Sequence, residues 1–145
     1  MNSAANLELR ELDASHADRI VDLVQLLNPS LTAETLHERL AQQWGTEGYY
    51  CVGLFRNGAI IGVSSAWVSV RLYGGKIVEL DNVIVDPAAR GGTGTRFLTL
   101  LEEKFTALGC GRVELKTYVQ NTRSHKFYFG NGFKIRAFYF VKGDH

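Results

Sequence analysis

The sequence predicts an α/β (α+β) fold, with a mixed and mostly antiparallel central sheet of about six strands and helices on both faces. Apolar runs of alternating polarity recur along the chain, and segments with apolar residues three and four positions apart lie between them. An Asn-Gly pair separates two of the apolar runs, which is a strong short-range signal of a hairpin. These observations predict one domain over residues 1–145, in the order β-α-α-β-β-β-α-β-α-β.

The first third of the chain is predicted to hold one strand and two helices. Leu7 to Leu12 alternates apolar and charged residues, as a half-buried strand does. Ser15 can cap the first helix, and Thr32 can cap the second. The apolar stripes of the two helices are Ile20, Leu23, Val24 and Leu27, and then Leu36, Leu40 and Trp44.

Three consecutive antiparallel strands are predicted next. An Arg-Asn-Gly turn that ends at Gly58 joins the first two, and Tyr73-Gly74-Gly75 turns the chain into the third. The three strands are expected over Tyr49 to Phe55, Ala59 to Val70 and Lys76 to Val85.

The last third is predicted to hold two helices and two strands. A helix is expected from about Thr95 to Leu108, because Gly109 is a natural residue to follow a helix. Asn121 can cap the second, short helix. The strands are expected over Val113 to Val119 and Phe133 to Val141.

The run from Leu80 to Thr95 is the most informative segment for function. Its apolar strand ends at Pro87, a glycine-rich turn follows, and a helix begins directly after the turn. The first N–H groups of a helix have no intrahelical acceptor, and glycines let an anion approach the backbone. The segment therefore predicts a site for a phosphate-bearing ligand, although an ordinary tight turn would use glycines too. Its spacing matches neither the P-loop nor the Gly-x-Gly-x-x-Gly pattern.

A second motif lies downstream, where Asn121 is followed by Phe127-Tyr128 and then by Gly132-Phe133. Together the two segments resemble the GCN5-related N-acetyltransferase (GNAT) superfamily, whose members join acetyl-CoA to amines. The resemblance covers Glu79 to Phe133, in the family's order and with nearly its spacing. It implies the family's fold and the transfer of an acetyl group, by direct attack, to a primary amine of a small molecule, a lysine or an N-terminus.

The glycine loop departs from the family pattern at one point. Counted from Arg90, the places that take glycine in the family hold Thr93 and Thr95. Counted from Ala89, both glycines fall correctly, but the first place lacks its usual Arg or Gln. A loop shortened by one residue is the simplest account, and it leaves the role of the Arg90 side chain open.

The resemblance also implies which residues hold acetyl-CoA. The backbone amides of Val83, Ile84 and Val85 would pair with the pantetheine arm, while their side chains belong to the core. Asn121 would either bond to the cofactor or only cap its helix. The pyrophosphate would lie on the backbone of Arg90, Gly91, Gly92, Thr93, Gly94 and Thr95.

Tyr128 is the first candidate for a catalytic residue. It occupies the tyrosine position of the family motif, and a phenol is protonated at neutral pH and can donate to a departing thiolate. A core tyrosine with a satisfied hydroxyl is the alternative. Glu79 and Asp81 share one face of their strand and are the candidates for the base, or they are ordinary solvated carboxylates. The acceptor is expected near Gln42, Gln43, Trp44, Trp67, Arg71 and Tyr73.

Composition narrows the class of partners. The formal net charge is +1, which argues against nucleic-acid binding through bulk charge, and no apolar run approaches the ~20 residues that a membrane span needs. Two lone cysteines without metal spacing and a start, Met1 to Arg10, without a signal peptide's apolar core predict a cytoplasmic protein without a metal. Family members usually carry one more C-terminal strand, so an uncovered sheet edge here would favour a homodimer. A non-catalytic module that binds acyl-CoA is the alternative function.

Overall fold

The computed structural model describes residues 6–143, so the first five residues of the stretch examined for a signal peptide lie outside the described part. The chain divides into two compact units, the first extending to Glu114 and the second beginning at Leu115. The first unit holds the sheet and most of the helices. The second unit holds one helix and the stretch of chain that follows it.

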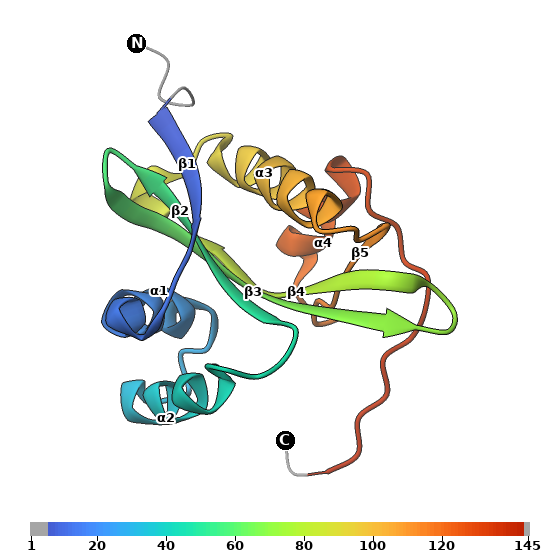
Figure 1. Ribbon diagram of the computed structural model, residues 1–145, viewed down its shortest axis with the longest axis horizontal. Helices are drawn as coiled ribbons and strands as arrows, with labels where there is room; N and C mark the ends of the chain where they lie inside the picture. Colours follow the sequence, from blue (N-terminus) through green and yellow to red (C-terminus); the bar gives the residue numbers. More distant parts are fainter. Residues whose placement is uncertain (1–5, 144–145) are drawn as a thin grey trace. The chain divides into compact units, whose positions relative to one another are not determined.

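The first unit contains a five-stranded sheet in the order β1-β2-β3-β4-β5 (Figure 1). The first four strands pair antiparallel with their neighbours, and α3 connects β4 to β5, a crossover typical of a parallel pair. The predicted fold class is therefore confirmed. The elements are β1 (Leu7–Glu11), η2 (Ala14–His16), α1 (Ala17–Leu27), α2 (Ala33–Gln43), β2 (Tyr49–Arg56), β3 (Ala59–Arg71), β4 (Gly75–Val85), η3 (Pro87–Ala89), α3 (Thr93–Ala107) and β5 (Arg112–Leu115).

The β2–β3 hairpin forms where the Asn-Gly pair predicts it. Asn57 and Gly58 both have positive φ angles, 51° and 81°, which is the backbone of a type I′ turn. This turn matches the twist of the flanking strands and sets the register at the tip of the hairpin, where Arg56 pairs with Ala59 and Phe55 with Ile60; beyond Phe55 the register shifts at an irregularity. The hairpin prediction is confirmed.

Helices cover both faces of the sheet (Figure 1). On one face, α1 and α2 bury Ile20, Leu23, Leu36 and Leu40 in a cluster with strand residues such as Val63. On the other face α3 buries Phe97 and Phe105, both 0% exposed, and the Phe105 ring packs edge-on against Tyr50 with centroids 5.5 Å apart. Gly62 belongs to this face, because a side chain there would meet the Phe97 ring.

The helix ends differ from the predictions in two places. The predicted cap Ser15 is wrong: the Asp13 carboxylate accepts the Ser15 N–H at 2.9 Å and caps η2, which leads into α1. Asp13 has the extended backbone of an N-cap, which places its side chain over the following N–H groups. Helix α3 begins at Thr93, two residues earlier than predicted, because Gly92 adopts the left-handed conformation before it.

Thr32 and Gly109 act as predicted. The Thr32 hydroxyl accepts the Thr35 N–H at 3.1 Å, which caps α2. Gly109 follows the end of α3 with a φ angle of 92°, a conformation that favours glycine.

The second unit contains α4 (Thr122–Gly130), with Asn121 as its N-cap. The predicted strand over Phe133 to Val141 is wrong, because this stretch forms no ladder and has no regular structure. Its β-branched and aromatic residues suit a strand, but a strand exists only where a neighbour supplies hydrogen bonds. The large side chains of the stretch are exposed instead, among them Phe138 at 88% and Phe140 at 89%.

Candidate functional site

The glycine loop between β4 and α3 presents a row of free backbone amides. Gly91 and Gly92 have φ angles of 115° and 83°, a backbone region that favours glycine. The first backbone hydrogen bond at this end of α3 runs from the Arg96 N–H to the Gly92 carbonyl, at 3.2 Å. Within residues 6–143, no backbone acceptor is found for the amides of residues 91–95. An anion at this helix end would meet several unused donors.

Two side chains, those of Arg19 and Asp86, fix the start of this loop on the rest of the first unit. The Arg19 guanidinium donates to Asp86 Oδ2 at 2.8 Å and to the Ile60 carbonyl at 2.9 and 3.1 Å. The second Asp86 oxygen accepts the Ala88 N–H at 3.0 Å. These hydrogen bonds, the Arg19 one above all, lower the pKa of Asp86 below its usual value, so the carboxylate stays charged at neutral pH. The loop is therefore held in place before any ligand arrives.

Strand β4 carries a β-bulge at its centre. Val63 pairs with Ile84 and Ser65 pairs with Asp81, so two β4 residues oppose one β3 residue. Asn82 lies in the bulge with a φ angle of 51°, which asparagine tolerates better than most residues. The extra residue shifts the alternation of β4 side chains between the two faces of the sheet. Ile84 therefore lies on the same face as Asp81, although three positions separate them.

Among the described residues of the first unit, no strand lies along the outer edge of β4 beyond the bulge. The Gly111 N–H bonds to the Lys76 carbonyl at 3.0 Å, so the four residues of β5 begin beside the start of β4. Beside an eleven-residue strand, β5 reaches only about as far as Leu80 or Asp81. Val83, Ile84 and Val85 therefore have no strand of the described first unit along this edge. Ile84 and Val85 are also buried, 4% and 8% exposed, which agrees with core side chains on this backbone.

Glu79 and Asp81 lie on one face of β4, as the alternation predicts. They pair with Trp67 and Ser65, and Trp67 and Ser65 pair in turn with Tyr49 and Cys51 of β2. Residues opposite each other in such a ladder share a face, and Cys51 belongs to the core beneath α1 and α2. The two carboxylates are therefore on the helix α1 and α2 side of the sheet.

Three aromatic rings stand beside these carboxylates. The Tyr49 ring lies 4.7 Å from Trp67 and 5.9 Å from Trp44, centroid to centroid. The Tyr49 hydroxyl is 3.3 Å from Ser65 Oγ. Burial raises the pKa of Tyr49 well above its usual value, and the neighbouring Cys51 and Asp81 act in the same direction. The Tyr49 hydroxyl thus stays protonated and serves as a neutral hydrogen-bonding group.

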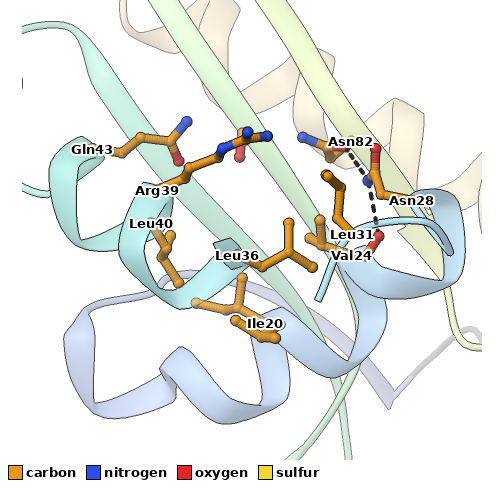
Figure 2. Close-up of a pocket in the computed structure, with 11 residues that line it drawn as sticks. Ile20, Val24, Asn28, Leu31, Leu36, Arg39, Leu40, Gln43 and Asn82 are labelled. Atoms are coloured by element: carbon orange, nitrogen blue, oxygen red, sulfur yellow. Dashed lines mark hydrogen bonds between the residues drawn. The ribbon is translucent and has the colours of Figure 1, made fainter. Parts of the chain in front are cut away.

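A cavity of about 150 Å³ opens on the same side of the sheet (Figure 2). Its walls come from α1, the turn after α1, α2 and the centres of β3 and β4. Apolar side chains form its floor, and the polar ends of Asn28, Arg39, Gln43 and Asn82 gather along its other side (Figure 2). The Asn28 amide donates to Asn82 Oδ1 at 3.2 Å and to the Val24 carbonyl at 3.0 Å. Ser65 also lines the cavity, and it is the residue of β3 that pairs with Asp81 of β4.

In the second unit, Asn121 and Tyr128 both have defined partners. Asn121 Oδ1 accepts the Ser124 N–H at 3.1 Å, which establishes its role as a cap. The Tyr128 ring lies between Phe127 and Phe133, with centroids 5.2 and 5.4 Å away. Burial raises the pKa of Tyr128 to about 12. The phenol therefore keeps its proton throughout the physiological range.

The structure unites some of the predicted acceptor residues and separates others. Gln43 lines the cavity, and Trp44 and Trp67 pack around Tyr49. Tyr73 is occupied elsewhere, because its hydroxyl donates to Glu114 at 3.2 Å and the Arg112 guanidinium lies over its ring. Arg71 donates to Ser69 on the exposed end of β3.

The sequence prediction missed Arg39 and Asn82. Arg39 stands on the same side of α2 as Leu36, Leu40 and Gln43, so a charge within an apolar stripe was the available signal. Asn82 interrupts an apolar strand, and asparagine within such a strand can mark a bulge.

Residues 20–133 of the chain match the family described as "Acetyltransferase (GNAT) family". A curated relative, the aminoalkylphosphonate N-acetyltransferase of Salmonella typhimurium, is 27% identical over 138 residues, which cover 93% of this chain and 90% of the relative.

Two solved structures share the fold. A protein of Agrobacterium tumefaciens named as an acetyltransferase aligns with a TM-score of 0.80 and 23% identity, over 94% of this chain and 99% of its own. An aminoglycoside N-acetyltransferase in complex with CoA aligns with a TM-score of 0.77 and 19% identity, over 94% of each chain.

Membrane-spanning helices and metal-binding clusters are both absent from residues 6–143. None of their helices combines the length and apolar character that crossing a bilayer requires. No group of three or more His, Cys, Asp or Glu side chains among them is placed to hold a metal ion.

Proposed function

The chain belongs to the acetyltransferase (GNAT) family and is thus an enzyme of acetyl transfer, and we propose that it moves an acetyl group from acetyl-CoA to a primary amine of a small molecule. The observation that carries this proposal is the row of unused amides at residues 91–95, where strand β4 leads through the glycine loop into α3. These donors suit the pyrophosphate of acetyl-CoA. The name of the curated relative favours a small-molecule amine over a lysine or an N-terminus.

The open edge of β4 supports the rest of the cofactor assignment. Acetyl-CoA supplies an activated thioester when bound. We propose that the free backbone edge at Val83, Ile84 and Val85 pairs with its extended arm, as an added strand would. One amide of this edge would polarise the acetyl carbonyl and stabilise the negative charge that develops during attack.

Two kinds of side chain complete the proposed chemistry. Glu79 or Asp81 removes a proton from the acceptor ammonium, directly or through water, so that the amine can attack. Tyr128 gives its proton to the departing thiolate, since burial keeps the phenol protonated. Asn121 already caps α4 through its oxygen, and its amide group is proposed as a second cofactor contact.

Acetyl-CoA should raise the melting temperature of the protein selectively. A ligand at about 100 times its dissociation constant stabilises the native state by roughly 2.7 kcal/mol, which is several degrees for a domain of this size. Differential scanning fluorimetry with saturating acetyl-CoA, beside ATP and NAD as controls, measures this shift. Equal shifts with all three nucleotides, or none at millimolar acetyl-CoA, would contradict the proposed cofactor site.

We further propose that the protein forms a homodimer in the cytoplasm. Both cysteines are free and buried, which suits a reducing compartment. Residues 133–142, named here the C-terminal segment, expose large apolar side chains and have the residue pattern of a strand. A second copy of the chain could cover this segment by strand pairing.

Sedimentation should therefore give a mass twice that of the 16.1 kDa chain. Replacing Phe138 and Phe140 by Asp should shift the protein to the monomer, because buried charges would oppose the contact. Val119→Asp is the matched control, since Val119 is as exposed as Phe140 but lies outside the C-terminal segment. A monomeric parent protein at micromolar concentration would rule the dimer out.

A further inference from the structure

The cavity beside α2 has an apolar side and a polar side. Its floor is apolar and includes Ile20, Leu36 and Leu40, whereas polar ends gather on its other side (Figure 2). Among the described residues that line it, Arg39 is the one that carries a charge. Arg39 is an exposed residue that also lines the cavity, so its guanidinium is accessible to a ligand that enters from solvent.

The Arg39 guanidinium has its donors available. Within residues 6–143, no hydrogen bond and no ion pair of this group is found. Other arginines of the same unit are engaged: Arg19 and Arg112 each lie 2.8 Å from a carboxylate. A guanidinium stays protonated at any ordinary pH and presents five N–H donors in a planar fork, which matches the oxygens of a phosphonate, phosphate, sulfonate or carboxylate.

Carboxylates lie next to the cavity on the sheet, although they do not line it. Ser65 lines the cavity and pairs directly with Asp81, and Glu79 occupies the next row of the ladder. Side chains in such opposed pairs stand about 4.5–5.5 Å apart at Cβ. A molecule that extends from the cavity past Ser65 would thus have a guanidinium of α2 at one end and carboxylates of β4 at the other.

We propose that the acceptor is a small zwitterionic amine, whose oxyanion group is bound by Arg39 and whose ammonium group faces Asp81 and Glu79. This inference rests on the proposed acetyl transfer and specifies its substrate. The volume of about 150 Å³ corresponds to the liquid volume of about five water molecules, so it suits a compact molecule with one amine and one oxyanion. Asn28, Gln43 and Asn82 supply neutral donors and acceptors around the oxyanion.

Acceptor kinetics with matched amines test this inference. The panel is 2-aminoethylphosphonate, O-phosphoethanolamine, taurine and β-alanine as oxyanion amines, with ethanolamine and propylamine as counterparts that lack an oxyanion. The parent protein should acetylate at least one oxyanion amine with a KM at least tenfold below those of the amines that lack an oxyanion. Arg39→Gln should raise that KM about tenfold, because a charge-assisted contact is lost, and leave kcat nearly unchanged.

Two variants separate a contact from a structural role. Arg39→Lys keeps the charge and should restore part of the affinity for the oxyanion amine. Arg10→Gln makes the same exchange as Arg39→Gln on an exposed arginine of β1, which pairs with Glu8, and should leave every KM unchanged. Equal KM values for amines with and without an oxyanion, or an equal loss for all amines in Arg39→Gln, would overturn the inference.

A binding measurement distinguishes this inference from the proposed function. Without acetyl-CoA, 2-aminoethylphosphonate should raise the melting temperature of the parent protein and not that of Arg39→Gln. This result would support the site even if no amine were acetylated, and then only the proposed function would fail. Efficient acetylation of amines that lack an oxyanion, without a melting shift by any oxyanion amine, would leave acetyl transfer intact and overturn the Arg39 assignment.

Discussion

Tyr128→Phe is expected to lower kcat by roughly 100-fold and to leave the affinity for acetyl-CoA nearly unchanged. The exchange removes one hydroxyl and keeps the ring that packs between Phe127 and Phe133. Because burial raises the pKa of Tyr128 to about 12, the phenol remains in its acid form at neutral and mildly alkaline pH. A loss of activity of the parent enzyme in that range should therefore have a cause other than deprotonation of Tyr128, and Tyr128→Phe should show the same loss.

Steady-state kinetics and a titration of acetyl-CoA by calorimetry measure the two effects separately. Tyr118→Phe is the matched control, since it removes the hydroxyl of a tyrosine in the same unit that is 75% exposed. Equal turnover in Tyr128→Phe and the parent would remove Tyr128 from the acid role. If the parent itself binds acetyl-CoA tightly and acetylates no amine, the non-catalytic acyl-CoA-binding alternative becomes the better account.

Gly94→Val is expected to weaken acetyl-CoA binding by about 100-fold. Gly94 lies in the first turn of α3, where its amide has no intrahelical acceptor, and a branched side chain there would crowd an approaching pyrophosphate. Each lost hydrogen bond to a charged group costs about 1.5–3 kcal/mol, so two such losses account for the expected factor.

The unliganded protein should tolerate this exchange. Valine and glycine differ little in helix propensity, so the melting temperature without ligand should change by only a few degrees. Thr106→Val is the control, because it places valine at an exposed position near the other end of α3. Calorimetry measures the dissociation constant of acetyl-CoA for both variants. An unchanged dissociation constant in Gly94→Val would show that the pyrophosphate does not lie on this turn.

The local elements of the first unit could be predicted because each rests on short-range chemistry. The Asn57-Gly58 turn has a pair of residue types that enter a type I′ turn easily, and Thr32 carries its own capping oxygen. The glycine loop could be predicted in the same way, since glycine has no side chain and Gly91 and Gly92 can therefore adopt positive φ angles. The start of α1 was misjudged because Asp13 and Ser15 are both good caps, and their competition is decided by backbone direction.

The C-terminal segment shows where local pattern stops being sufficient. Residues such as Ile135 and Phe138 have strand propensity, yet a strand needs a partner backbone, and the segment has none along the described chain. Propensity is a property of one residue and its neighbours, whereas a ladder is a property of two segments.

The sequence by itself determined the fold class, the family and the order of the glycine loop and the Asn…Phe-Tyr…Gly-Phe motif, since each depends on residues close together in the chain. Only the tertiary structure decided that Arg39 of α2, Ser65 of β3 and Asn82 of β4 line one cavity. The β4 bulge and the packing of α1 and α2 on the sheet bring these residues together, and both depend on strand register and on contacts between distant segments. Long-range packing therefore set the shape of this cavity and the residues that line it, which no window of the sequence contains.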